Sequence, residues 1–294
     1  MIEHTKMNQK KAISVDLSEI ASNIQNELED TYSNTGKQSV STDRTIVTGI
    51  PGFDSLMRTG VPRGSNILVC GGPGSGKTIF CLQLLAHHAE QGKKCLFISF
   101  EESEKRLIEH MEEFGWDPVQ LIEDGYLSIK RYLTSDVYYD ENARDDSVHA
   151  MMAKETDQYT MDLEPFVIGD AGFRPEIIVI DSLTSIASTF VGGKQRYRMY
   201  LDRLFRFFET LESTNFLISE KMLQQNELMG NEAEDFLADG VIYFYNSRKH
   251  NVRESAVEIL KMRGVSHDKK IVAMNITDKG IIVYPDQEAF SKYD

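Results

Sequence analysis

The sequence has few cysteines and no long apolar run, and both absences narrow the class of protein. Among 294 residues there are only three cysteines, Cys70, Cys81 and Cys95. Their spacing fits no metal site, so we expect buried packing roles in a reducing compartment. No stretch reaches the roughly 18 apolar residues of a membrane-spanning helix. The polar first residues also lack the apolar segment of a signal peptide. We therefore expect a cytoplasmic protein without a membrane span.

Positive charge is also scarce. The chain has 32 Lys and Arg against 46 Asp and Glu, which gives a formal net charge of −14. So acidic a surface repels nucleic-acid phosphates unless basic residues are concentrated locally. We therefore expect no nucleic-acid partner.

The chain divides by composition near residue 42. Residues 1–42 are polar and contain no proline, and we expect them to form an N-terminal extension. Its apolar residues recur at helical spacing: Ile13, Leu17, Ile20, Ile24 and Leu28. One interpretation is a partly disordered tail, and the other is a helix that docks on a partner or a neighbouring subunit. Residues 43–294 are expected to form the folded domain, because 41% of the sequence is apolar and a substantial core is possible.

Within this domain, apolar segments alternate between strand and helix patterns. The expected strands are 66–70, 95–100, 127–130, 177–180, 216–219 and 241–245. The expected helices are 78–90, 104–114 and 195–210, and residues 255–284 read as a C-terminal β meander. The acidic stretch 138–162 is expected to be an insertion or a poorly packed helix on the surface. This alternation predicts an α/β fold with a mostly parallel sheet flanked by helices.

A phosphate-binding loop is the most specific motif. Residues 71–78 read Gly-Gly-Pro-Gly-Ser-Gly-Lys-Thr, between an expected buried strand and an expected helix. Glycines let backbone N–H groups turn inward around phosphates. Lys77 brings a charge to the β- and γ-phosphates, and Thr78 offers a hydroxyl to Mg²⁺. The pattern predicts a site for ATP with Mg²⁺, formed by Gly72, Pro73, Gly74, Ser75, Gly76, Lys77 and Thr78.

Acidic residues end two of the expected strands. Asp181 follows Ile180 at a strand end that faces the ligand crevice, and we predict that it holds Mg²⁺ together with Thr78. Glu101 and Glu102 end another strand and point to different sides. We predict that Glu101 accepts a proton from the attacking water and that Glu102 assists. The alternatives are an Asp181 that caps the next turn and glutamates that belong to an acidic first helical turn.

Further segments match one family when they are taken together with these motifs. They are TGIPGFDSL at 48–56, GVPRGS at 60–65, FGWD at 114–117, IDSL at 180–183, LKMRGVSH at 260–267 and TDKGI at 277–281. In this order they resemble the KaiC-like branch of RecA-type ATPases over about residues 45–285. The resemblance implies a RecA-like P-loop NTPase core that forms a ring, usually a hexamer, with ATP between subunits.

The resemblance also implies that part of each site comes from the neighbouring subunit. Lys261 and Arg263 would approach the γ-phosphate, and Met262 between them would contact the nucleotide, although alternating charges are also ordinary on an exposed strand edge. From the same neighbour, four residues would line the ribose and base: Ser266, His267, Thr277 and Asp278.

The chain departs from the family pattern in two ways. It carries one such domain, whereas the clock protein of the family carries two. The family's autokinase domain has a Ser-Thr pair where this chain reads Ala-Glu-Asp-Phe-Leu-Ala-Asp at 233–239. Without a hydroxyl there, we expect no autophosphorylation at that site.

Three functions remain open from the sequence. The leading one is a Mg²⁺-dependent ATPase that acts as an oligomeric switch on a protein partner. The second is a recombinase paralogue that binds single-stranded DNA, but the stretch 224–239 is acidic and has no Lys or Arg. Its only local counterweight is the basic run Arg248, Lys249, His250 and Arg253. The third is a nucleotide-binding scaffold with little turnover, which the glutamate pair disfavours.

Overall fold

The computed structural model describes residues 44–133, 173–188, 194–221, 233–249 and 252–290. The extension 1–42 and the insertion 138–162 lie outside the described residues. The helix expected in the extension and the domain boundary at residue 42 therefore stay predictions.

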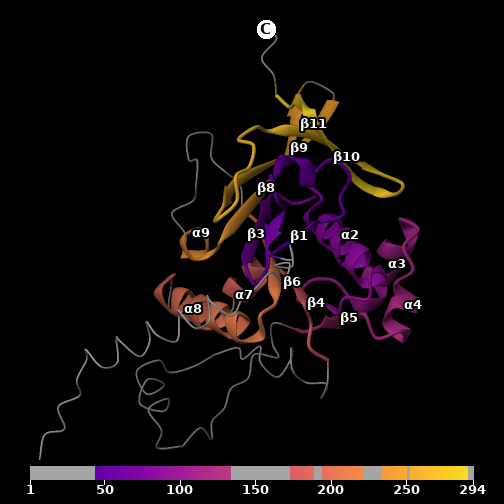
Figure 1. The fold of residues 1–294 in the computed structure, drawn as a ribbon, viewed down its shortest axis with the longest axis vertical. Coiled ribbons are helices and arrows are strands. Elements are labelled where there is room, and N and C mark those ends of the chain that lie inside the picture. The colour runs from indigo at the N-terminus through magenta and orange to yellow at the C-terminus, as the bar shows by residue number, and fades with distance from the viewer. Residues whose placement is uncertain (1–43, 134–172, 189–193, 222–232, 250–251, 291–294) are drawn as a thin grey trace, which may run out of the picture. The chain divides into compact units, whose positions relative to one another are not determined.

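One large sheet forms the centre of the domain (Figure 1). Its order is β11-β10-β9-β8-β3-β7-β6-β4-β5, in which the strands from β8 to β5 run parallel and β9, β10 and β11 are antiparallel additions. This arrangement confirms the predicted α/β class, the mostly parallel sheet and the C-terminal meander. The strands are β3 (Asn66–Gly71), β4 (Cys95–Ser99), β5 (Leu127–Arg131), β6 (Ile177–Asp181), β7 (Thr214–Ser219), β8 (Gly240–Lys249), β9 (Val252–Met262), β10 (Val272–Thr277) and β11 (Gly280–Glu288).

Helices cover both faces of the sheet, because side chains of a buried strand alternate between two cores. In β3, Ile67 and Val69 pack into the core shared with α2 (Lys77–Glu90), α3 (Glu104–Glu113) and α4 (Pro118–Glu123). Leu68 and Cys70 pack into the opposite core, shared with α7 (Leu183–Ser188) and α8 (Lys194–Leu211). The remaining elements are short: β1 (Thr45–Ile46), η1 (Asp54–Leu56), β2 (Val61–Pro62) and α9 (Ala233–Leu237).

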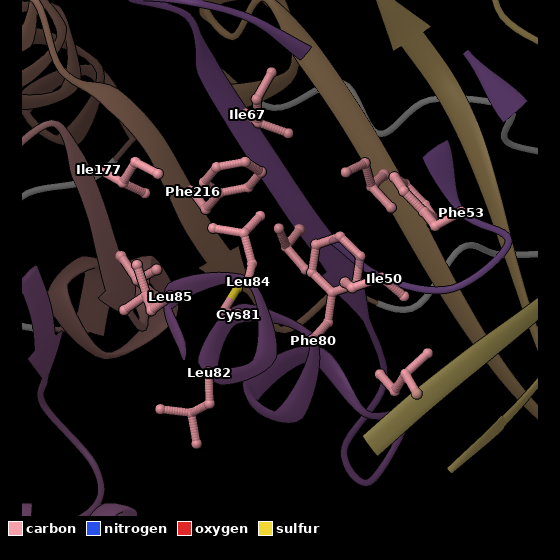
Figure 2. Close-up of a cluster of buried hydrophobic side chains, with 14 of the residues drawn as sticks. Ile50, Phe53, Ile67, Phe80, Cys81, Leu82, Leu84, Leu85, Ile177 and Phe216 are labelled. Carbon is pink, nitrogen blue, oxygen red and sulfur yellow. The ribbon is translucent and has the colours of Figure 1, made fainter. Parts of the chain in front are cut away.

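The core beneath α2 fixes the helix that follows the phosphate loop. Figure 2 shows Phe80 pointing toward Ile50 and Phe53, and the Phe53 and Phe80 rings meet edge to face with centroids 5.1 Å apart. Phe80 also lies 5.2 Å from the Phe244 ring of β8. Truncating so buried an aromatic ring typically costs about 3–5 kcal/mol. The start of α2 is therefore held firmly against the sheet.

All three cysteines are free and buried, as expected. Cys81 packs on this α2 side, and burial raises the pKa of its thiol well above the usual value. Such thiols are inert packing groups.

The TGIPGFD segment fastens a loop to α2. Asp54 Oδ1 accepts hydrogen bonds from the backbone N–H of Thr48 at 2.7 Å and from its hydroxyl at 2.9 Å. A Cβ on Gly49 would lie 2.1 Å from the His87 ring of α2, so only glycine fits there. This motif therefore supports the helix of the phosphate loop and lies outside the loop itself.

Candidate nucleotide site

The phosphate loop joins the carboxyl end of β3 to the first turn of α2. A Cβ on Gly71 would lie 2.5 Å from the carbonyl oxygen of Phe244 and 2.8 Å from Ser75 Oγ, so the loop turns too tightly for a side chain. Gly76, with a φ of 98°, starts the helix in a conformation that favours glycine. Asn246 of β8 donates from Nδ2 to the carbonyl oxygen of Gly74 at 3.1 Å and braces the outer part of the loop.

Two polar groups inside the loop are placed so that phosphate oxygens could accept hydrogen bonds from them. Lys77 is buried, with 6% of its side chain exposed, and its Nζ donates to the carbonyl oxygen of Gly72 at 2.9 Å. The nearest carboxylate is Glu220, just after β7, whose Oε1 lies 3.9 Å from Nζ. Ser75 Oγ is buried without a hydrogen-bond partner. Buried polar atoms are rarely left unpaired, so this loop fits a phosphate ligand.

Thr78 and Asp181 meet as the predicted metal pair. Asp181 ends β6, and its Oδ2 accepts a hydrogen bond from Thr78 Oγ1 at 2.8 Å. The pKa of Asp181 is raised to about 7, mainly by burial; the Thr78 hydrogen bond and the charge of Lys77 lower it, and the carboxylates of Glu101 and Glu102 raise it. A divalent cation would stabilise the ionised carboxylate at this place.

The Thr78 hydroxyl and the Asp181 carboxylate suit magnesium better than a metal that takes all its ligands from protein side chains. Among the described residues, no group of three or more His, Cys, Asp or Glu side chains is arranged to hold a metal. Magnesium at a phosphate loop takes most of its oxygen ligands from water and phosphate, so one hydroxyl and one carboxylate suffice.

The two glutamates after β4 point to different partners, as predicted. Glu101 Oε1 accepts hydrogen bonds from Ser182 Oγ at 2.7 Å and from Ser185 Oγ at 2.8 Å, at the start of α7. Glu102 Oε2 lies 3.2 Å from Arg106 Nε and 3.8 Å from His110 Nδ1 on α3. Glu101 therefore sits on the side of Asp181, whereas Glu102 forms an ion pair with Arg106.

Neither Asp181 nor the pair Glu101 and Glu102 caps a helix in the structure. Helix α3 begins at Glu104 and is capped by Ser103, whose Oγ accepts from the N–H of Arg106. At α7, Ser182 Oγ accepts from the N–H of Ser185 at 3.2 Å. Both glutamates and Asp181 thus precede the helices and do not cap them.

The Lys-x-Arg segment lies at the far end of the sheet from the phosphate loop of its own chain. Met262 pairs with Gly240, and Gly240 pairs with Ile67 at the start of β3, whereas the phosphate loop begins at Gly71. Along the strand direction, the rise of four residues from Ile67 to Gly71 separates the backbone of Met262 from the start of the phosphate loop by about 13 Å. The structure therefore does not bring these cations to the Lys77 of the same chain.

Both cations are held by the segment around α9. Lys261 Nζ donates to the carbonyl oxygen of Ala238 at 2.6 Å. Arg263 donates from Nη1 to Asp239 Oδ1 and from Nη2 to the carbonyl oxygen of Phe236, each at 3.1 Å. The Arg263 side chain is 55% exposed. These contacts orient the two side chains more than an ordinary solvated strand edge would.

The four residues expected at the ribose and base occupy two separate places. His267 forms an isolated bridge with Met57, and the carbonyl oxygen of the adjacent Ser266 accepts from the N–H of Arg58 at 3.0 Å. His267 Nε2 is buried without a partner. Thr277 and Asp278 belong instead to the β10–β11 turn.

The strands on either side of this turn pack on α2 of their own chain. Gln83 of α2 accepts from the N–H of Ile281 at 2.7 Å and donates to its carbonyl oxygen at 3.2 Å. A Cβ on Gly76 would lie 3.2 Å from Ile276 Cδ1. Thr277 itself bonds within the turn, since its Oγ1 donates to the carbonyl oxygen of Gly280 at 2.8 Å.

Sequence reasoning missed several groups of the site. Their partners are far away in the chain, so no local pattern indicates them: Ser182, Ser185, Glu220 and Asn246. Ser182 is the one of these residues that the sequence could have indicated, because it directly follows the predicted metal ligand Asp181.

Comparisons with known proteins agree with this architecture. The family model described as "ATPase: KaiC" matches residues 46–288. A circadian clock oscillator protein KaiC of Acaryochloris marina is 31% identical over 257 residues, which are 86% of this chain and 46% of that protein. A UPF0273 protein of Pyrococcus furiosus is 28% identical over 250 residues, covering 83% of this chain and 95% of the relative. The chain thus spans about half the length of the clock proteins that it matches.

A solved structure shows the same fold. The crystal structure of a KaiC-like protein from Pyrococcus horikoshii matches with a TM-score of 0.65 and 28% identity, over 82% of this chain and 99% of that one. The sheet described above is therefore a RecA-like core, as predicted. None of the helices in the described segments is long and apolar enough to cross a membrane.

Proposed function

The chain belongs to the KaiC family of ATPases, and from that premise we propose that it hydrolyses ATP with Mg²⁺ between the subunits of a ring. ATP binding and ATPase activity follow from the family. The ring, the shared site, the metal and the roles of single residues are our proposal.

The observation that carries the proposal is the convergence of three strand ends. The phosphate loop follows β3, Glu101 follows β4 and Asp181 ends β6, so the carboxyl ends of these strands deliver a phosphate cradle, a base and a metal ligand to one edge. Ligands bind at this edge in open α/β sheets.

Each group has a chemical task that its surroundings support. Lys77 and the N–H groups of the loop hold the β- and γ-phosphates. Thr78 and Asp181 hold Mg²⁺, which neutralises charge on the phosphate oxygens when it is bound. Glu101, oriented by the Ser182 and Ser185 hydroxyls, accepts the proton of the attacking water. Glu102 assists from the opposite side, where its ion pair with Arg106 ties the end of β4 to α3.

The separation of the Lys-x-Arg segment from its own loop supports a site shared between subunits. A cation about 13 Å away along the strands cannot reach its own γ-phosphate, yet phosphoryl transfer needs positive charge beyond Lys77. Lys261, Met262 and Arg263 would therefore serve the next subunit. Head-to-tail contacts of this kind close into a ring, and the number six comes from the family resemblance alone.

The nucleotide's ribose and base would be contacted by the neighbouring subunit. Ser266 and His267 follow the end of β9, close to Arg263, whereas Thr277 and Asp278 lie at the β10–β11 turn. As the family resemblance implies, all four would come from the neighbour that supplies Arg263.

A regulatory role on a protein partner extends the proposal, since relatives include circadian clock oscillator proteins. No observation favours the recombinase alternative. In the described part of the acidic stretch, Glu234 is buried in an ion pair and Asp239 pairs with Arg263. Of the basic run, the described residues Arg248, Lys249 and Arg253 lie at the end of the pairing between β8 and β9.

Replacing Lys77 by alanine tests nucleotide binding. We expect an affinity for ATP with Mg²⁺ that is about 10- to 100-fold weaker, because one charged hydrogen-bonding group is lost from the phosphates. Titration calorimetry measures the change, with Lys105→Ala as the control, since Lys105 is 85% exposed on α3. Equal affinities of the two variants would exclude the loop as the site.

The raised pKa of Asp181 predicts a pH dependence of magnesium binding. With a pKa of about 7, Asp181 carries a proton below that pH and must lose it to hold the cation. Magnesium affinity of the ADP-bound protein should therefore rise about tenfold from pH 6 to pH 8. Asp181→Asn keeps the shape without the titration, so the difference between the two proteins removes the contribution of the nucleotide's own phosphate. An identical pH dependence in both proteins would contradict the assignment.

A further inference from the structure

Two adjacent residues after β7 contact both halves of the shared site. Glu220 Oε1 lies 3.9 Å from Lys77 Nζ, and its N–H donates to Thr184 Oγ1 at 2.8 Å. The next residue, Lys221, lies on the other side, where its Nζ is 2.7 Å from Glu234 Oε2. One dipeptide therefore joins the phosphate loop to α9.

The Glu234 carboxylate is the anchor of α9. Its side chain is only 3% exposed, and besides Lys221 it accepts hydrogen bonds from Ser219 Oγ at 3.1 Å and from the hydroxyl of Tyr197. A buried carboxylate is stable only while such partners remain, so removing the Lys221 ammonium weakens the anchor strongly.

The segment anchored in this way holds Arg263. Ala238 donates its N–H to the carbonyl oxygen of Glu234 at 2.9 Å, which continues the turn of α9. The two groups that bind the Arg263 guanidinium, the Phe236 carbonyl and the Asp239 carboxylate, follow directly. Asp239 is also tied to β3, since Asn66 donates its N–H to Asp239 Oδ2 at 3.0 Å, so the contact between Lys221 and Glu234 supports mainly the Phe236 side of the Arg263 guanidinium.

We propose that Glu220 and Lys221 are positioning residues that transmit nucleotide occupancy from a subunit's own phosphate loop to the arginine that it offers to the next subunit. This inference rests on the proposed shared site. The γ-phosphate and the Glu220 carboxylate are both anions that favour the place beside Lys77, so ATP displaces Glu220. This displacement moves the adjacent Lys221 against the hydrogen bond that its carbonyl oxygen accepts from Tyr243 Oη at 2.8 Å, draws its ammonium away from Glu234, and so loosens the hold of α9 on Arg263.

Such coupling needs a measurable response of α9 within one subunit. Amide hydrogen exchange of the intact protein, with and without a non-hydrolysable ATP analogue and Mg²⁺, reads residues 71–80 and 233–239 in one experiment. It is done at protein concentrations at which the analogue does not change the sedimentation coefficient. We expect protection at 71–80 and exchange at 233–239 that becomes at least about fivefold faster, the lower end of typical coupling between sites.

Variants separate coupling from a merely structural role. Glu220→Gln removes the competing charge and should bind the analogue several-fold more tightly while the response at 233–239 disappears. Lys221→Met should show fast exchange at 233–239 without ligand and no further response, whereas Lys221→Arg should restore the response. Glu209→Gln, on the exposed side of α8, is the matched control and should behave like the parent.

The outcomes distinguish this inference from the proposed function. Protection at 71–80 with unchanged exchange at 233–239 would overturn the coupling and leave ATP binding intact. No protection at 71–80 would overturn both. A Glu220→Gln variant with the parental affinity and response would also overturn the role of Glu220, and this variant does not disturb the buried Glu234 anchor.

Discussion

Replacing Arg263 by alanine is expected to lower kcat for ATP hydrolysis by about 10³- to 10⁵-fold, the range typical of an arginine that stabilises charge on a transferring phosphoryl group. The affinity of the phosphate loop for ATP should change far less, because Arg263 lies at the opposite end of β3 and β8 from its own Lys77. Steady-state turnover at saturating ATP measures the first quantity, and calorimetry measures the second.

Two controls sharpen this prediction. Arg263→Lys keeps the charge but loses the planar fork of donors, so it should recover only part of the activity. Arg206→Ala removes an exposed arginine from α8 and should keep parental turnover. Parental kcat in Arg263→Ala, in a protein that still assembles by sedimentation, would contradict the assigned role.

Replacing Glu101 by glutamine should lower kcat by about 10²- to 10⁴-fold, the usual loss when a general base is removed. Glutamine keeps the shape and can still accept from Ser182 and Ser185, so ATP binding should persist. Glu102→Gln is the matched control, since that carboxylate forms an ion pair with Arg106 on α3. Its loss should be much smaller.

The relative size of the two effects assigns the base. Single-turnover measurements with each glutamine variant separate the chemical step from product release. A larger loss in Glu102→Gln than in Glu101→Gln would reverse their roles. Parental turnover in the double variant would remove the pair from catalysis.

The sequence predicted the fold and the edge of the sheet where the site lies. Strand ends and the phosphate loop are local features, because a buried apolar run and the residue that ends it are adjacent in the chain. For this reason the pairing of Thr78 with Asp181 followed without coordinates, although 103 residues separate them.

The rest of the site depends on contacts between distant segments. Asn246 reaches the phosphate loop only because β8 pairs with β3, and Glu220 reaches Lys77 only because β7 does. Neither residue carries a motif. The sequence also could not show that His267 and Thr277 lie in different places. Both follow β9 within a short stretch of chain, but His267 pairs with Met57 whereas Thr277 ends β10.

Mixing two inactive variants tests the shared site most directly. Lys77→Ala and Arg263→Ala subunits, assembled together, would form some interfaces with an intact phosphate loop on one side and an intact arginine on the other. We predict ATPase activity well above that of either variant alone, rising with the fraction of mixed assemblies. Mixed assemblies that demonstrably form yet show no recovery, or a parental protein that is active as a monomer by sedimentation, would contradict a site shared between subunits.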